Sequence, residues 1–271
     1  MKHKIKLGIV GCGAIGSEIA RGCVSLLSDK IALIALYDIE REKSLRLSDS
    51  LGKNIAVNSE EELFNIADLI VESASGEAAG SVLQKAIEKT KDVMIMSIGG
   101  LLGSGGLLEK AEKKGIRVYL PSGAICGIDG LKGARLSKIR TVTLTTKKPP
   151  KGLSGAPYLK EKGIDIDSVK EETVIFEGNA RDAVRGFPKN VNVASLLSLA
   201  GIGAPETVVR IVTSPAYTKN VHEVKITGDF GEITTRTENV PSKKNPKTSR
   251  LAYLSAIATL KGIVESVKIG T

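Results

Sequence analysis

Aromatic residues and cysteine are scarce in this chain of 271 residues, which has no tryptophan, five tyrosines and four phenylalanines. Proteins that hold single-stranded nucleic acid usually stack its bases on exposed aromatic rings, so the composition argues against a nucleic-acid partner. The three cysteines, Cys12, Cys23 and Cys126, lack Cys-x-x-Cys spacing, which excludes the common disulfide and zinc frameworks. We therefore expect reduced thiols and no metal.

Long hydrophobic runs are also missing. The apolar run at residues 66–71 contains Asp68 and is far shorter than a membrane span. The N-terminus passes from Met-Lys-His-Lys directly into a strand-like stretch, without the apolar core of a signal peptide. These absences predict a cytoplasmic protein with no membrane partner.

Negative charge is in deficit only in the second part of the chain. Residues 1–121 carry 16 Lys plus Arg and 16 Asp plus Glu, whereas residues 122–271 carry 23 and 14, so the second part accounts for the formal charge of +9. A lysine-rich solvated surface is the simplest explanation. A small anionic ligand is the alternative that has a functional consequence.

Short β-branched runs alternate with amphipathic helical stretches in the first half. Such alternation predicts right-handed crossovers and a Rossmann-like, doubly wound parallel sheet, an α/β fold. The expected strands are 4–10, 31–37, 68–72, 93–97 and 117–120, and the expected helices are 14–27, 40–51, 77–90 and 106–114.

After residue 121 the pattern predicts a second, α+β domain with a mostly antiparallel sheet. We expect strands at 139–146, 173–176, 208–212, 221–226 and 232–237, helices at 127–137, 180–185 and 191–200, and an irregular stretch over 149–166. A final helix over 247–267 is expected to return to the first domain. The expected domains are thus 1–121 with 246–271, and 122–245.

A glycine-rich fingerprint lies between the first strand and the first helix. Its first glycine permits a tight turn, the second lets the backbone approach a pyrophosphate, and the third allows close packing of helix on strand. The second strand ends at Asp38, 22 residues after the last glycine, where an acid binds the adenosine ribose. The pattern predicts NAD binding, with NADP allowed if Arg41 accommodates the extra phosphate. The fingerprint residues are Gly11, Cys12, Gly13, Ala14, Ile15 and Gly16.

Small residues follow two further strands of the first domain. Ala74 comes after the strand at 68–72, and Ser97 and Gly99 lie at the end of the strand at 93–97. Ligands of open α/β sheets bind at the carboxyl ends of strands, so we expect these residues to contact the dinucleotide. Ordinary turn chemistry is the alternative.

His222 is one of only two histidines, and the other, His3, is near the N-terminus. Imidazole is the side chain best suited to proton transfer near neutral pH, which makes His222 the candidate catalytic residue of a dehydrogenase. The alternative is a structural histidine satisfied by a polar neighbour.

Several second-domain motifs accompany His222 in order: Pro-Ser-Gly-Ala-Ile at 121–125, Phe-Pro-Lys-Asn-Val-Asn-Val-Ala at 187–194, Asn-Val-His-Glu at 220–223, and Glu-Asn-Val-Pro followed by Asn-Pro-Lys-Thr-Ser at 238–249. Together with the fingerprint, they make the chain resemble the L-aspartate dehydrogenase family over nearly its whole length. The resemblance implies NAD- or NADP-dependent oxidative deamination of L-aspartate through iminoaspartate, or the reverse. It also implies that His222 is catalytic and that Ala124 and Asn190 contact the cofactor.

The implied partners are L-aspartate, oxaloacetate and ammonia, in a homo-oligomer with a dimer favoured. Iminoaspartate could be handed on to quinolinate synthesis and so feed NAD biosynthesis. A neutral His222 could deprotonate the water that attacks the imine. A dicarboxylate also needs cationic or amide-rich contacts, for which the candidates are Ser122, Lys189, Asn192, Lys247 and Thr248.

Two other functions fit the same sequence. One is an NAD(P)-dependent reductase of a different small anion, of the dihydrodipicolinate or semialdehyde type, although a dihydrodipicolinate-like site would usually show paired histidines. The other is a non-catalytic redox sensor that binds NAD and signals through its basic second domain.

Overall fold

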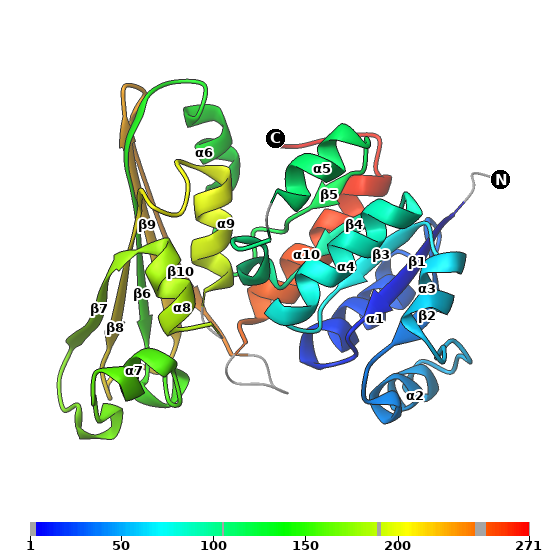
Figure 1. Ribbon diagram of the computed structural model, residues 1–271, viewed down its shortest axis with the longest axis horizontal. Coiled ribbons are helices and arrows are strands. Elements are labelled where there is room, and N and C mark those ends of the chain that lie inside the picture. The colour runs from blue at the N-terminus through cyan, green and yellow to red at the C-terminus, as the bar shows by residue number, and fades with distance from the viewer. Residues whose placement is uncertain (1–3, 105, 189–190, 242–247, 271) are drawn as a thin grey trace. The chain divides into compact units, whose positions relative to one another are not determined.

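The computed structural model describes residues 4–104, 106–188, 191–241 and 248–270 (Figure 1). Within these ranges the chain divides into two compact units. Unit 1 takes residues up to 121 together with 252–268, and unit 2 takes 122–251 together with 269–270.

Unit 1 is built on a parallel five-stranded sheet in the order β2-β1-β3-β4-β5, which confirms the predicted Rossmann-like fold. Its strands are β1 (Ile5–Val10), β2 (Ile31–Tyr37), β3 (Leu69–Glu72), β4 (Asp92–Ile95) and β5 (Val118–Tyr119). Its helical segments are α1 (Ala14–Leu26), α2 (Arg41–Ser50), α3 (Glu60–Ile66), α4 (Gly76–Lys89), η1 (Ile98–Leu101), α5 (Leu107–Lys113) and α10 (Arg250–Val264).

Side chains of the central strands alternate between two apolar clusters, one on each face of this sheet. Ile70 packs in a cluster with residues of α3, α4 and α5, whereas Leu69 and Val71 pack in a cluster with residues of α1, α2 and α10. Strands covered on both faces are apolar throughout, which is why these segments read as continuous hydrophobic runs. Ala256 and Leu260 of α10 are fully buried in the second cluster.

A single bridge extends the sheet beyond β2. The backbone N–H of Leu36 donates to the carbonyl of Ile55 at 2.8 Å, and that of Val57 donates to the carbonyl of Leu36 at 3.0 Å, giving a parallel bridge at Ala56. With this bridge counted as a minimal strand, the sheet has the strand order of the dinucleotide-binding Rossmann fold. The chain order reverses between β1 and β3, and ligands bind at such a switch point.

Unit 2 holds a mixed sheet in the order β10-β9-β6-β8-β7, in which β6 and β8 run parallel and every other neighbouring pair is antiparallel. This confirms the predicted, mostly antiparallel second sheet. Its strands are β6 (Ile139–Lys148), β7 (Thr173–Asn179), β8 (Thr207–Thr213), β9 (Asn220–Gly228) and β10 (Gly231–Asn239). Its helical segments are α6 (Ile128–Ala134), η2 (Pro150–Gly152), α7 (Pro157–Glu161), η3 (Ile166–Ser168), α8 (Ala180–Gly186) and α9 (Asn192–Ala200).

One face of the second sheet is covered by helices (Figure 1). Leu144 and Val224 project from β6 and β9 into an apolar core that also contains Leu131 of α6, Ala183 of α8 and Leu197 of α9. On the other face, the alternate residues of β10 are exposed: Glu232, Thr234, Arg236 and Glu238. Position along each strand therefore decides whether a side chain lies under the helices or on the open face.

The expectation of an irregular stretch at 149–166 is wrong. It contains η2, α7 and the start of η3, and it buries Leu153, Leu159 and Ile166 in the core of unit 2. The ring of Tyr158 in α7 lies 5.3 Å from those of both Phe176 and Phe187. The stretch is a structural cover for one end of the sheet.

Helix α9 begins at Asn192, directly after Val191, so the predicted helix over 191–200 is confirmed. The predicted start of the last helix is wrong. Helix α10 begins at Arg250, whose backbone N–H donates to the carbonyl of Val240 at 3.0 Å, and not at residue 247. Thr248 therefore precedes the helix and its amide does not form part of the first turn.

Candidate active site

The fingerprint loop between β1 and α1 leaves room where a dinucleotide needs it. Gly11 has a φ of +94°, and a Cβ there would lie 2.5 Å from the backbone nitrogen of Ala74. A Cβ at Gly16 would lie 1.9 Å from the carbonyl oxygen of Gly11, whereas a Cβ at Gly13 would meet nothing within 4 Å. Gly11 and Gly16 are thus required by packing, and Gly13 is the glycine that leaves open space at the start of α1. A bound pyrophosphate would face the amides of Ala14 and Ile15 there.

Asp38 follows β2 and is joined to the fingerprint by a hydrogen bond. The backbone N–H of Cys12 donates to Oδ2 of Asp38 at 2.7 Å, and that of Glu40 donates to Oδ1 at 2.9 Å. These contacts fix the carboxylate beside the loop before any ligand arrives. Arg41, the first residue of α2, is exposed.

Cys12 is not a reactive thiol. Burial and, to a smaller extent, the negative charge of Asp38 raise the pKa of Cys12 to about 12, so the sulfur stays protonated. Cys23 is buried too, and burial raises its pKa to about 12, whereas Cys126 is exposed. Only a thiolate is a strong nucleophile, so the two buried cysteines act as packing residues.

A buried carboxylate holds two of the predicted cofactor residues. Glu72 ends β3 with 0% exposure, and its Oε1 accepts hydrogen bonds from the N–H of Ala74 at 2.8 Å and the hydroxyl of Ser97 at 2.9 Å. Its Oε2 accepts from the N–H of Ser97 at 2.9 Å. Burial raises the pKa of Glu72, while these hydrogen bonds oppose the rise. Glu72 was not among the predicted site residues, although a lone acid at the end of an apolar strand is a usable signal.

The loops after β3 and β4 also approach each other through glycines. A Cβ at Gly100 would lie 1.9 Å from the carbonyl oxygen of Gly76, and Gly99 is in the same 3-10 turn, η1. Gly11, Cys12, Gly13, Asp38, Ala74, Ser97 and Gly99 therefore lie at the carboxyl ends of adjacent strands in unit 1, linked by the contacts above.

In unit 2, His222 is buried on the helix-covered face of β9. It is 3% exposed, and its Nδ1 lies 3.0 Å from Oγ1 of Thr146, its cross-strand neighbour on β6. Burial, and then the positive charge of Lys148, lower the pKa of His222 to about 3. The imidazole is therefore neutral at physiological pH, as a general base must be before it accepts a proton.

Lys148 is a buried lysine on the same face of the sheet as Thr146. It lies on β6, two residues after Thr146, with 6% exposure. Burial lowers its pKa to about 8. The expected strand ended at residue 146, whereas β6 continues through Lys147 and Lys148.

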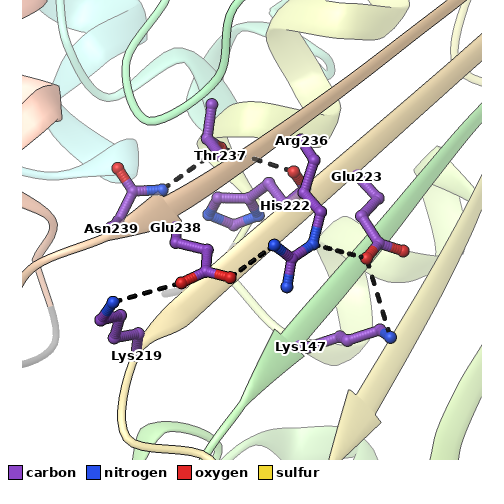
Figure 2. A network of polar contacts seen from close by, with 8 residues as sticks. All are labelled: Lys147, Lys219, His222, Glu223, Arg236, Thr237, Glu238 and Asn239. Carbon is purple, nitrogen blue, oxygen red and sulfur yellow. Dashed lines mark hydrogen bonds and ion pairs between the residues drawn. The ribbon is translucent and has the colours of Figure 1, made fainter.

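Ala124 is tied to the strand beside His222. Its carbonyl oxygen accepts hydrogen bonds from Oγ1 of Thr237 at 2.9 Å and from Nδ2 of Asn239 at 3.0 Å. Thr237 is the cross-strand partner of His222, and its hydroxyl lies 3.4 Å from the carbonyl oxygen of His222 (Figure 2). Ser122, whose carbonyl accepts from the N–H of Ile125 at 3.4 Å, belongs to the same turn.

Charged side chains occupy the opposite face of the same strands (Figure 2). Glu223 lies 3.7 Å from Lys147 and 3.1 Å from Arg236, and Glu238 pairs with Arg236 and lies 3.2 Å from Lys219. These ion pairs neutralise part of the positive charge on this face.

The remaining predicted substrate and cofactor residues fall into two groups. Lys189, Asn190 and Lys247 lie outside the described residues. Asn192 opens α9, and Thr248 precedes α10. Among residues 4–104, 106–188, 191–241 and 248–270, no group of three or more His, Cys, Asp or Glu could hold a metal ion. No helix in those ranges is long and apolar enough to cross a membrane.

Known proteins share both units of this chain. A family model described as the C-terminal part of aspartate dehydrogenase matches residues 129–263, and one described as the NAD-binding domain of homoserine dehydrogenase matches residues 11–121. The L-aspartate dehydrogenase of Methanosarcina barkeri is 45% identical over 271 residues, covering 98% of this chain and 100% of the relative. That of Methanococcus maripaludis is 42% identical over 270 residues, with coverage of 98% and 100%.

Solved structures agree with these matches. The crystal structure of aspartate dehydrogenase from Thermotoga maritima is 25% identical, covers 99% of this chain and 100% of its own, and has a TM-score of 0.75. A homoserine dehydrogenase from Thiobacillus denitrificans, 14% identical, covers 97% of this chain and 73% of its own with a TM-score of 0.65, and so shares the fold. With a relative 45% identical over 98% of its length, this chain belongs to the L-aspartate dehydrogenase family.

Proposed function

We propose that the protein catalyses the NAD(P)-dependent oxidative deamination of L-aspartate to iminoaspartate, which water converts to oxaloacetate and ammonia, or the reverse of this reaction. Similarity to L-aspartate dehydrogenases over almost the whole chain supports the proposal. The structural observation that carries it is a neutral, buried His222 on β9, next to the Thr237 of β10 that donates a hydrogen bond to the carbonyl of Ala124.

Unit 1 is proposed as the dinucleotide-binding domain. Gly13 and the first amides of α1 would receive the pyrophosphate, and Asp38 would bind the adenosine ribose, because the open space at Gly13 and the fixed carboxylate fit that ligand. Ala74, Ser97 and Gly99 would border the other half of the cofactor, and the family resemblance adds Ala124 and Asn190 as proposed cofactor contacts. When bound, the nicotinamide accepts a hydride from the α-carbon of aspartate.

His222 is proposed as the proton acceptor. Loss of hydride from the α-carbon of the neutral amine leaves a protonated imine, and the attacking water must lose a proton as its oxygen bonds to that carbon. The neutral imidazole takes this proton and returns it to the nitrogen. The C–N bond then breaks, ammonia leaves, and the new hydroxyl group gives its remaining proton to the imidazole as the carbonyl forms. Ser122, Lys189, Asn192, Lys247 and Thr248 are proposed contacts for the two carboxylates.

We further propose that NAD is the preferred cofactor, because Asp38 repels the 2′-phosphate of NADP, with NADP used if Arg41 turns toward it. The proposed setting is a cytoplasmic homodimer that passes iminoaspartate to quinolinate synthesis. These details rest on the family resemblance and on Asp38.

A panel assay tests the function. For the oxidative direction, purified protein is mixed with NAD or NADP and with one of L-aspartate, L-glutamate, L-alanine or L-malate. For the reverse direction, it is mixed with NADH or NADPH, ammonia and a 2-keto acid. We expect reduction of the nicotinamide with L-aspartate at least tenfold faster than with the other substrates. Cofactor binding without any turnover would identify a sensor, and turnover of a different anion without ammonia would identify a reductase; either result refutes the proposal.

A further inference from the structure

The helix-covered face of the second sheet changes character along β6 and β9. Val142 and Leu144 on β6, like Val224 and Ile226 on β9, are apolar and buried in the core. Further toward the end of β6, and the start of β9, the residues on this face are polar yet equally buried. They are Thr146, Lys148, Asn220 and His222. Buried polar groups cost free energy, so a polar end on an apolar face indicates a function.

Lys148 and His222 are diagonal neighbours within this polar end. Thr146 lies opposite His222 in the register of β6 and β9, and Lys148 follows two residues later on the same face. Diagonal neighbours across a strand pair are about 7–8 Å apart, which the lysine side chain can span. A Cβ placed at Gly152 would lie 3.5 Å from both Cβ and Cδ of Lys148, so the stem of the lysine runs along η2.

Lys148 is the charged group that acts on His222. The neighbouring residues on β10, Thr237 and Asn239, are uncharged, and the ion pairs of Glu223, Arg236, Glu238 and Lys147 occupy the open face. Among the described lysines and arginines, Lys148 alone is buried. If Lys148 only filled space, it would stabilise the fold less than a methionine at this position, because burial disfavours its charge.

A neutral imidazole beside a buried ammonium suits an anionic ligand. A carboxylate placed near Lys148 would form a charge-assisted hydrogen bond, and it would cancel the positive field that opposes protonation of His222. The same contact would therefore bind substrate and strengthen the base that the reaction needs.

We infer that Lys148 receives one carboxylate of the dicarboxylate substrate beside His222, and that this carboxylate offsets the charge of the lysine at the imidazole. The inference rests on the proposed function, since it assigns a substrate contact in that reaction. Lys148 is thus both a specificity residue and the residue that couples substrate binding to proton transfer.

The test measures binding of succinate in the presence of NADH. Succinate is a dicarboxylate without an amino group, so the enzyme cannot oxidise it as it would oxidise aspartate. Calorimetry gives its affinity for wild-type protein, K148M, K148R and the control K147M, whose altered side chain lies on the opposite face of the same strand. We expect K148M to bind succinate about 10- to 100-fold more weakly, K148R to retain part of the affinity, and K147M to stay within twofold of wild type. Equal affinity in K148M and K147M would overturn the inference.

Nuclear magnetic resonance of the imidazole supplies a readout that requires no substitution at Lys148. The chain has two histidines, so a His3→Ala variant assigns the His222 signal. Without ligand, we expect that signal not to titrate between pH 5 and pH 7, a range below the pKa of about 8 of Lys148. Succinate should shift the signal and raise its midpoint. A His222 signal unaffected by saturating succinate would refute the coupling.

K148M should raise the midpoint of His222 without ligand and abolish its response to succinate. Thermal unfolding of each variant reports whether it is folded. If K148M does not fold, the titration of His222 in wild-type protein with and without succinate decides whether the carboxylate acts on the imidazole. Absence of aspartate-dependent turnover in wild-type protein would refute the proposed function, whereas the succinate measurements separately decide the role of Lys148.

Discussion

Oγ1 of Thr146 lies 3.0 Å from Nδ1 of His222, between two adjacent strands and beneath a layer of helices. A hydroxyl can accept a hydrogen bond from a protonated Nδ1 or donate one to an unprotonated Nδ1. A base that acts through Nε2 carries its own proton on Nδ1, and in that tautomer the hydroxyl oxygen of Thr146 is the acceptor. Thr146 thereby fixes both the ring orientation and the nitrogen available to water, which makes it a positioning residue.

Substitution T146V should lower kcat about tenfold and leave the affinity for the cofactor within twofold. Valine keeps the shape and strand preference of threonine but removes the hydrogen-bond partner of Nδ1, so the imidazole loses the contact that orients its ring. T146S should restore most of the rate, and T145V, altered on the open face of the same strand, is the matched control. A T146V enzyme with wild-type kcat would show that Thr146 does not position the base.

Substitution H222A should reduce kcat by a factor of about 10² to 10⁴, the usual contribution of a general base. The dissociation constant of the cofactor, measured by fluorescence of bound NADH, should change by no more than a few-fold, since the imidazole handles protons. Near-normal aspartate turnover in H222A would remove His222 from the mechanism. The variant H3A provides the histidine control.

Substitution D38A should shift cofactor preference toward NADP. Removing the carboxylate removes the repulsion of a 2′-phosphate, so the ratio of kcat/KM for NADP to that for NAD should rise about tenfold or more. Affinity for NAD should fall as well, because the N–H of Cys12 loses its acceptor. As a control, E42Q changes an exposed acid in the first turn of α2 and should leave the NADP to NAD ratio unchanged. An unchanged ratio in D38A would contradict the placement of the ribose at Asp38.

Substitution E72Q should weaken binding of the dinucleotide about tenfold. The two oxygens of Glu72 accept from the N–H of Ala74 and from the hydroxyl and N–H of Ser97. Glutamine replaces one of these oxygens with an amide nitrogen, which donates and cannot accept. A buried donor is then left unsatisfied at a cost of about 1–3 kcal/mol. Titration of NADH fluorescence measures the effect. E109Q, at an exposed position of α5, is the control, and equal affinities in the two variants would mean that Glu72 does not organise the loops.

Lys148 should make stability depend on pH in the alkaline range. Its pKa is about 8 in the folded protein against 10.5 ordinarily, so between these values the unfolded chain binds more protons and the free energy of unfolding rises with pH. The full difference corresponds to roughly 3 kcal/mol. Urea unfolding of wild type and K148M at pH 7, 9 and 10.5 should show K148M more stable at pH 7 and the gap closing by pH 10.5. A gap that is constant with pH would contradict burial of the ammonium.

The sequence predicted the fold because strand and helix periods are local signals. The fingerprint and Asp38 were predictable for the same reason, since their spacing alone brings them to adjacent strand ends. Helix α3 was missed even though Ser59 and Glu62 form an N-terminal signal: the hydroxyl of Ser59 accepts from the N–H of Glu62 at 3.1 Å. That helix could have been predicted.

The polar surroundings of His222 could not be predicted from local pattern. Thr146 and His222 are 76 residues apart, and only the register of β6 with β9 makes them neighbours. Lys148 stands in a Lys-Lys-Pro-Pro segment typical of an exposed turn, and a strand that extends two residues further than expected turns it under the helices. Burial of a charge is decided by such tertiary detail, which sequence spacing does not record.

The two hydrogen bonds that hold the carbonyl of Ala124 bear on where this protein can be cut and recombined. Thr237 and Asn239, which make those bonds, adjoin the strand of His222, so Ala124 and His222 are parts of one folded block. A chimaera with a relative should therefore join the sequences at Pro121 rather than after the Ser122–Cys126 turn. Joined there, each parent contributes the turn together with the strands that shape it.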